Sequence, residues 1–251
     1  MPIITFPLRD KAILAGLYLS KFDKEGLDLL GFNSFKEAYN IIGFALKCKP
    51  NSIKNYRDEF DPLFPNRRLG WENRDIRPYV KKIYDKYNEL DLNTLAKTIK
   101  ESIYRNSEID ILMEQIECNE NNDSSFAKRL ATGQAAEYYF EENYKKCELF
   151  KDSELENTTK YGCGFDFKLK KPNLDYIVVE VKGLSEMTGN IVMTNKEYSV
   201  SQIFGDRYFL FIVKNFKENP FYKIFQNPSK CDLKFQHSEY TVKQILWSTY
   251  V

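Results

Sequence analysis

The sequence is poor in histidine, with His237 as its single example in 251 residues. Zinc hydrolases and nucleases of the His-Asn-His or phospholipase-D type need more than one imidazole, so none of these sites can be built here. Any hydrolytic chemistry must therefore depend on carboxylates and lysine.

Paired cysteines and long apolar runs are also missing. The five cysteines are widely scattered and contain no Cys-x-x-Cys pair, which predicts reduced and mostly structural thiols. No apolar run approaches the roughly 18 to 20 residues that cross a bilayer. Near the N-terminus, Arg9, Asp10 and Lys11 precede the apolar stretch, which is not the order of a signal peptide. We therefore expect a cytoplasmic protein with no membrane partner.

Net charge is low, at +1, but it is unevenly distributed. From Leu46 to Lys86 there are eleven basic and six acidic residues, interleaved with Tyr56, Trp71 and Tyr79. Such a segment could follow a phosphate backbone. The charge alone fits a solvated helical surface equally well.

The first half of the chain has helical patterns. Ser34 and Glu37 have the spacing of a capping box at the start of a helix that runs to about residue 46. The next helix is expected to have Ser52 as its cap, after a turn at Pro50, and to end before Pro62. Two helices joined by a short turn predict a helix-turn-helix element.

The second helix of this element would present its polar residues, including Asp58, to a ligand. We take as candidate DNA contacts the basic, amide and aromatic residues in and just after it: Lys54, Asn55, Arg57, Arg67, Arg68, Trp71 and Arg74. An ordinary amphipathic helix in a bundle is the alternative. Further helical patterns span residues 79–90 and 93–106, and residues 118–125 lose all apolar periodicity. We therefore expect a helical DNA-binding domain over 1–118 and a second domain over 119–251.

The second half alternates between helix and strand patterns. Helices are predicted over 125–147 and 195–205, and strands over 163–169, 175–184, 190–194 and 207–214, with one more strand possible within 234–251. The expected class is α+β: an N-terminal helical bundle with a helix-turn-helix-like element, followed by an α/β domain with a mixed sheet.

Two of these strands form a predicted hairpin that brings carboxylates together. If the turn is centred on Asn173, Asp166 lies opposite Glu180, and directly opposed residues have Cβ atoms about 4.5 to 5.5 Å apart. Two carboxylates this close repel unless a cation such as Mg²⁺ lies between them. Lys182 shares the face of Glu180. The alternative is a hairpin whose face with Glu180 and Lys182 is simply exposed to solvent. Tyr176 lies on that face as well and argues against this, because a solvated face should be polar along its whole length.

The helix before the hairpin carries another carboxylate. Glu137 falls within an apolar stripe that includes Leu130, Gly133 and Phe140. Burying an unpaired charge costs several kcal/mol, so this carboxylate needs a partner such as a nearby metal site. The alternative is that Glu137 lies at the margin of the stripe and reaches solvent.

This arrangement resembles the PD-(D/E)XK nuclease superfamily, with Glu137 in "GQAAEYYF", Asp166 in "GFDF", and Glu180 and Lys182 in "VVEVKG". Phe165 stands where a proline usually precedes the aspartate. The blocks "YGCGFDFKL", "DYIVVEVKGL" and "NIVMTNKEY" resemble a nuclease-like domain of bacterial restriction and defence proteins, and the chain from Ser34 to Trp71 resembles a helical domain that accompanies such nucleases. The resemblance implies a restriction-endonuclease-like fold for the second domain.

The resemblance also implies roles for individual residues. Asp166, Glu180 and the carbonyl of Val181 would hold Mg²⁺, with Mn²⁺ as a substitute, and Glu137 would bind a second ion or a water on the metal. Lys182 would orient the attacking water or stabilise charge on the phosphate. Asn195 and Glu197 recur in the resembling domain without a clear role.

The implied function is a Mg²⁺-dependent endonuclease of restriction type acting on double-stranded DNA. A symmetric homodimer is expected, because cutting both strands usually takes two active sites. One alternative is a DNA-binding or defence protein that keeps the nuclease fold without cutting. Another is a nuclease acting on RNA or branched DNA.

Overall fold

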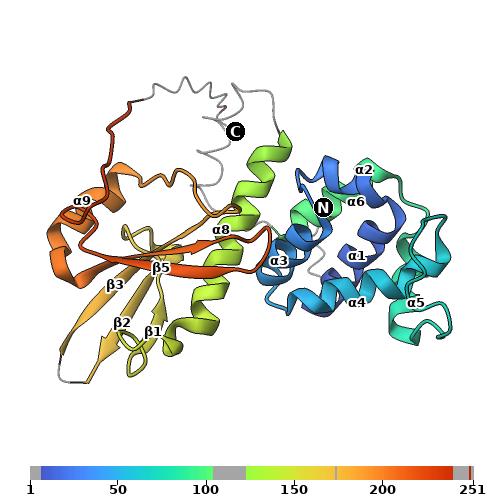
Figure 1. Cartoon of the computed structure of the whole chain (residues 1–251), viewed down its shortest axis with the longest axis horizontal. Coiled ribbons are helices and arrows are strands. Elements are labelled where there is room, and N and C mark those ends of the chain that lie inside the picture. The colour runs from blue at the N-terminus through green and yellow to red at the C-terminus, as the bar shows by residue number, and fades with distance from the viewer. Residues whose placement is uncertain (1–6, 104–122, 173, 240–248, 250–251) are drawn as a thin grey trace.

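The structure is a computed structural model that describes residues 7–103, 123–172, 174–239 and 249 (Figure 1). Helices make up the first half of the chain, on the right in Figure 1. Their bounds are α1 Leu8–Lys21, α2 Asp23–Leu29, α3 Phe35–Ala45, α4 Pro50–Phe60, α5 Pro78–Tyr87 and α6 Leu92–Ile103, with a 3-10 turn, η1, at Asp61–Leu63. The predicted helical bundle is therefore confirmed for the described residues.

Helix α1 is the centre of this bundle. Every residue from Ala12 to Ser20 is buried, because α2 through α6 all pack around it. Its closest neighbour is α4: a Cβ added to Gly16 would lie 2.5 Å from the Cβ of Tyr56, so only glycine allows the two backbones to approach this closely. A helix buried on all sides lacks the amphipathic stripe that marks a surface helix.

Helices α3 and α4 form the predicted pair joined by a short turn. The Ser34 hydroxyl accepts a hydrogen bond from the Glu37 backbone N–H, as expected for an N-cap. The prediction for α4 is wrong in detail, because the helix starts at Pro50 rather than after Ser52. Proline suits the first helical position, since its missing N–H would have no partner there. A DNA-reading role for the pair stays a prediction.

The second half combines a long helix with a five-stranded mixed sheet. Helix α8 spans Asp123–Asn143 and α9 spans Asn195–Phe204. The strands are β1 Glu154–Asn157, β2 Phe167–Lys171, β3 Leu174–Gly183, β4 Tyr208–Lys214 and β5 Phe221–Gln226, in the spatial order β1-β2-β3-β4-β5. Only β3 and β4 are parallel; the other neighbours are antiparallel. The expected mixed sheet is confirmed.

The two faces of the sheet are covered by different helices. Helix α8 packs through Phe140 on the face that carries Phe167 and Phe211, with ring centroids 4.8 Å apart in both pairs. On the opposite face, Phe204 of α9 contacts Tyr176. Successive residues of β3 therefore face opposite sides of the sheet, and Glu180 and Lys182, like Tyr176, face the side covered by α9.

The predicted pairing of Asp166 with Glu180 is confirmed, although the register shifts between Leu169 and Lys171, and Lys171 pairs with Leu174 at the turn. Phe167 pairs with Val179 and Leu169 with Ile177, so continuing by one residue sets Asp166 opposite Glu180. The strand prediction for 190–194 is wrong, because these residues have no regular structure and lead directly into α9. Strands β1 and β5 were not predicted. Of the suggested C-terminal strand, 234–239 have no regular structure, and 240–248, 250 and 251 lie outside the described residues.

The two halves contact each other through α3. Asn40 donates hydrogen bonds to the carbonyls of Phe216 and Glu218, at 2.7 and 2.9 Å. Glu37, which is fully buried, binds the Lys128 ammonium of α8 at 2.7 Å and the Ser185 hydroxyl just after β3. The predicted domain boundary at residues 118 and 119 falls outside the described residues.

None of the described helices is long and apolar enough to cross a membrane. The four described cysteines, Cys48, Cys147, Cys163 and Cys231, form no disulfide.

Candidate active site

Asp166 and Glu180 meet where β2 begins and β3 ends. Asp166 is held by its backbone, whose N–H donates to the Val179 carbonyl at 3.1 Å and whose carbonyl accepts from the Thr158 N–H at 2.8 Å. Its carboxylate accepts a further bond from the Val181 N–H at 2.8 Å. The Glu180 side chain is almost completely buried. Asp166 is therefore fixed beside the strand that carries Glu180.

Lys182 lies between two carboxylates. Its ammonium is 2.6 Å from Glu180 Oε1 and 2.8 Å from Glu197 Oε2, which reaches the lysine from α9. The sequence did not assign Glu197 this position. Its local signal, a Thr194-to-Glu197 capping box at the start of a helix, was present but indicates only a helix start.

Glu197 has two tasks at once in this arrangement. The same oxygen, Oε2, accepts from Lys182 and from the Thr194 backbone N–H at 3.0 Å, which completes the capping box of α9. The start of α9 and the lysine ammonium are thus fixed by one carboxylate. Asn195, the first residue of α9, is exposed and makes no side-chain hydrogen bond within the described chain.

The cluster has an excess of negative charge. Asp166, Glu180 and Glu197 supply three carboxylates against the one ammonium of Lys182, which leaves two negative charges when all are ionised. Burial, followed by the charge of Glu137, raises the pKa of Asp166 to about 7. Burial and the charge of Asp166 raise the pKa of Glu180 well above its usual range.

The pKa of Lys182 moves in the direction that keeps it charged. Burial alone would lower this pKa, but the charges of Glu180, Glu197 and Asp166 outweigh burial and raise it. The lysine is thus a permanent ammonium at neutral pH. It neutralises only part of the charge on the surrounding carboxylates.

Glu137 lies on α8, and its charge is among the causes that raise the pKa of Asp166. The close approach of α8 to the sheet depends on Gly183 at the end of β3, where a Cβ would lie 2.6 Å from the Thr132 carbonyl oxygen. Glycine at this point lets α8 lie against the strand end. The structure therefore brings together four of the predicted residues, Glu137, Asp166, Glu180 and Lys182.

The donor set suits Mg²⁺. The pKa values of Asp166 and Glu180 are raised, so a cation beside these buried groups would favour their ionised forms. With the Val181 carbonyl, which lies between Glu180 and Lys182 in the chain, they are oxygen ligands of the kind that Mg²⁺ prefers. Mg²⁺ commonly keeps several waters and needs only one or two protein carboxylates. In the part of the chain that the structure describes, no three acidic, histidine or cysteine side chains already form a metal-binding group.

The predicted DNA contacts divide into two groups. Arg57 and Arg68 belong to a largely buried network: Arg57 binds Asp58 at 2.5 Å, and Arg68 binds Asp61 at 3.0 Å. Both guanidinium groups also lie over the ring of Phe35, at 4.9 and 5.0 Å. The expected outward orientation of Arg57 and Asp58 is therefore wrong, because the side chains of both are only 11% exposed.

The remaining candidates are accessible to different degrees. Lys54 and Asn55 are exposed on α4, although Lys54 is paired with Asp58 at 2.6 Å. Arg67 and Arg74 are exposed in the segment between η1 and α5, and Trp71 in the same segment is half-buried. These positions lie in the helical half and are not part of the carboxylate cluster.

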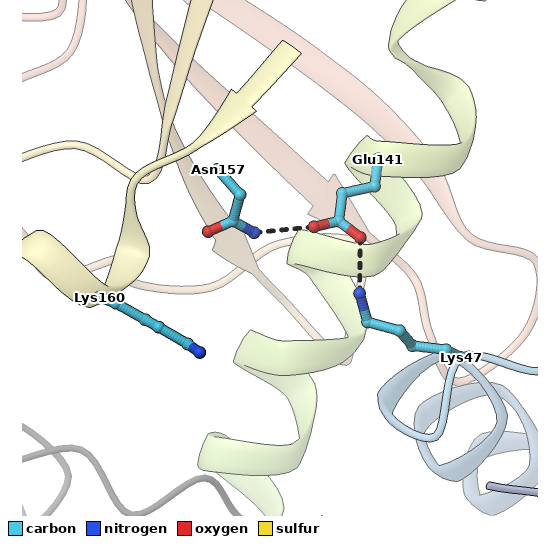
Figure 2. A pocket seen from close by; sticks show the side chains of 4 residues that line it. All are labelled: Lys47, Glu141, Asn157 and Lys160. Atoms are coloured by element: carbon cyan, nitrogen blue, oxygen red, sulfur yellow. Dashed lines mark hydrogen bonds and ion pairs between the residues drawn. The ribbon is translucent and has the colours of Figure 1, made fainter.

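A hollow of about 700 Å³ lies where the two halves meet, lined by Lys47, Glu141, Asn157 and Lys160 (Figure 2). Glu141 bridges Lys47 at 2.9 Å and Asn157 at 2.8 Å, from the middle of the hollow. None of the predicted catalytic residues lines it. Asn157 nevertheless ends the strand that is followed by Thr158, the backbone partner of Asp166.

Fold and site together define a mixed α+β protein with a buried cluster of carboxylates and one lysine at the C-terminal end of β3, the central strand of the sheet. In a comparison with known families, residues 135–226 match the family model described as Protein NO VEIN, C-terminal. This segment is less than half of the chain and contains all of Glu137, Asp166, Glu180, Lys182 and Glu197. No curated protein and no solved structure matches the chain.

Proposed function

We propose that this protein is a Mg²⁺-dependent endonuclease that hydrolyses phosphodiester bonds in duplex DNA, with a PD-(D/E)XK-type active site. The observation that carries the proposal is the convergence of Asp166, Glu180 and Lys182 where β2 begins and β3 ends. The charge excess there favours a divalent cation, and the lysine is held charged beside it.

Each side chain of the cluster has a defined task in this proposal. Asp166, Glu180 and the Val181 carbonyl would hold the ion, and Glu137 would bind a second ion or a water. The bound Mg²⁺ would supply Lewis-acid stabilisation of the charge on the scissile phosphate. Lys182 would donate a hydrogen bond to the attacking water or to a phosphate oxygen, and its pairing with Glu197 would keep it oriented.

The reaction is a simple hydrolysis. The water oxygen forms a bond to phosphorus, the bond from phosphorus to the leaving oxygen breaks, and the leaving oxygen takes up a proton. The products are a phosphate monoester end and a hydroxyl end.

The experiment is incubation of the purified full chain with genomic, phage and plasmid DNA in Mg²⁺, followed by sequencing of the ends. RNA and branched DNA are included as parallel substrates. Metal-dependent cuts in duplex DNA that disappear in the Lys182→Ala variant support the proposal. A Lys182→Ala variant that cuts like the wild type would show that the nuclease activity does not come from this cluster.

The division of roles between metal ligands and lysine has its own test. Calorimetric titration with Mn²⁺ should detect binding to the Lys182→Ala variant, because the lysine is not a ligand. Loss of Mn²⁺ binding in that variant, with a normal melting curve, would contradict the assignment.

A further inference from the structure

A row of stacked arginine and aromatic side chains lies on the helical half, between α1, α5 and the segment before α5. Arg9 lies over the Tyr79 ring at 4.6 Å, and Arg77 lies over the other side of the same cluster, 5.0 Å from Tyr79 and 5.6 Å from Trp71. Arg74 lies over Trp71 at 4.7 Å. We call Arg9, Tyr79, Arg77, Trp71 and Arg74 the arginine ladder.

Four contacts between a guanidinium group and a ring join the five residues of the ladder. Each such contact is weakly attractive at an exposed site, so together they restrict the motion of the arginine side chains.

The ladder is held in place by the backbone and by one buried carboxylate. Arg77 binds Glu59, whose side chain is 2% exposed, at 2.6 Å, and the Trp71 N–H donates to the Asp58 carbonyl at 2.9 Å. Gly70, at φ +53°, lies so close that a Cβ would be 2.2 Å from the same carbonyl oxygen. The segment that carries Trp71 and Arg74 is therefore closely packed onto α4.

The two outer arginines differ from the inner one. Arg77 is neutralised by Glu59, whereas neither Arg9 nor Arg74 has a carboxylate partner within the described residues. Glu72 and Asp75, next to the ladder in sequence, are exposed and form no ion pair with it in that part of the chain. Two exposed guanidinium groups are thus held extended by rings and left open to an external anion.

We propose that the arginine ladder is the surface that holds the phosphate backbone of duplex DNA, with Arg9 and Arg74 on phosphates. Planar guanidinium forks bind phosphate oxygens in pairs, and a rigid support lowers the entropy lost on binding. Arg57 and Arg68 are excluded from this role, because buried carboxylates already occupy them. The inference deepens the proposed function by naming where the substrate would be held.

The test is a fluorescence anisotropy titration of a labelled duplex of roughly 30 base pairs with the full chain, without divalent metal and over a range of salt concentrations. The Arg9→Ala/Arg74→Ala double variant is compared with a Lys24→Ala/Lys97→Ala double variant. The control removes two exposed positive charges from α2 and α6, so both variants change the net charge equally.

The ladder variant should bind about tenfold more weakly, and the slope of log affinity against log salt should fall by about two, since each lost phosphate contact contributes about 0.9. The control should stay within about twofold of the wild type. Equal binding by the ladder variant and the control overturns the inference, as does a wild-type chain that does not bind DNA. The inference is also overturned if polyglutamate displaces the labelled duplex as effectively as unlabelled DNA does, because the surface would then bind acidic protein.

Cleavage assays separate this inference from the proposed function. If the ladder variant binds DNA like the control and still cuts in Mg²⁺, the proposed function stands and the DNA-binding role of the ladder is rejected. If binding depends on the ladder but the wild-type chain never cuts, the role of the ladder stands and the proposed function is rejected.

Discussion

Lys182 is the central residue of the candidate site, and two carboxylates from different elements fix its position. Glu180 binds it from the same strand face, and Glu197 binds it from α9. If Glu180 is also a metal ligand, Glu197 is the carboxylate that remains to hold the ammonium. Glu197 is thus expected to act as a positioning residue beyond its part in the helix cap.

A pair of variants separates these two tasks of Glu197. Glu197→Gln keeps an oxygen that can accept from the Thr194 N–H but removes the charge beside Lys182, so cleavage should fall about tenfold or more with little change in melting temperature. Thr194→Ala removes the cap hydroxyl and should cost about 1 kcal/mol of stability while cleavage stays near wild type. The measurements are single-turnover cleavage and thermal melting. Wild-type cleavage by Glu197→Gln would leave the residue a capping role only.

The raised carboxylate pKa values predict how stability depends on pH without metal. Between the usual carboxylate range near 4 and about 7, folded Asp166 retains a proton that the unfolded chain has lost, and Glu180 shifts in the same direction. Their contribution to the free energy of unfolding therefore falls as pH rises through this window. Urea melts in EDTA should show the wild type losing stability, relative to Glu180→Gln, from pH 5 to pH 8. A constant difference between the two proteins across this range contradicts the shifts.

At the scale of elements, α3 decides how the helical half meets the sheet half. Glu37 is fully buried and binds Lys128 of α8, Ser185 after β3, and the Asn33 N–H. Burial raises the pKa of Glu37, but these partners outweigh burial and lower it overall. Ser185 belongs to the loop that follows the strand of Glu180 and Lys182, so α3 supports the site through this contact.

Two neighbouring residues on α3 make a matched test of this contact. Glu37→Gln should lower the free energy of unfolding by about 2 to 3 kcal/mol, because it leaves the partly buried Lys128 ammonium without its charge partner. Lys36→Ala, which breaks the exposed pair with Glu218, should cost less than about 1 kcal/mol. Urea denaturation checks both values. A Glu37→Gln variant within about 0.5 kcal/mol of the wild type would show that this contact is not a main support of the interface.

The elements that the sequence predicted correctly have local causes. The spacing around an assumed turn centre at Asn173 set Asp166 opposite Glu180, and the structure has this pairing. The pairing depends, however, on a register shift between Leu169 and Lys171 that the sequence did not predict. Residues 190–194 have a strand-like composition but pair with no strand of the described sheet, and lead into α9 instead. Glu197 was left without a role, since its contact with Lys182 depends on how α9 packs over the sheet. Arg57 was placed outward for the same kind of reason, because its contact with Phe35 depends on how α3 packs against α4.

At the scale of the whole molecule, charge is divided between two regions. The sheet half holds a buried cluster of three carboxyl groups and one lysine, which would carry excess negative charge when ionised and would then suit a divalent cation. The helical half presents exposed arginines, which suit an anion. A nearly neutral chain therefore contains two regions of opposite character. The proposed reaction needs both regions, because the arginines would bind the anionic DNA and the carboxylates would bind the Mg²⁺ ion.

The central claim is that the cluster around Glu180 cuts DNA, and the most direct measurement compares two carboxylate variants of the same strand. Glu180→Ala removes the buried carboxylate, whereas Asp175→Asn changes an exposed one that is paired with Arg207. In Mg²⁺, supercoiled plasmid should be cut by the wild type and by Asp175→Asn, and the rate for Glu180→Ala should fall by about a hundredfold or more. Equal cutting by Glu180→Ala and the wild type, with both proteins folded, would contradict the account.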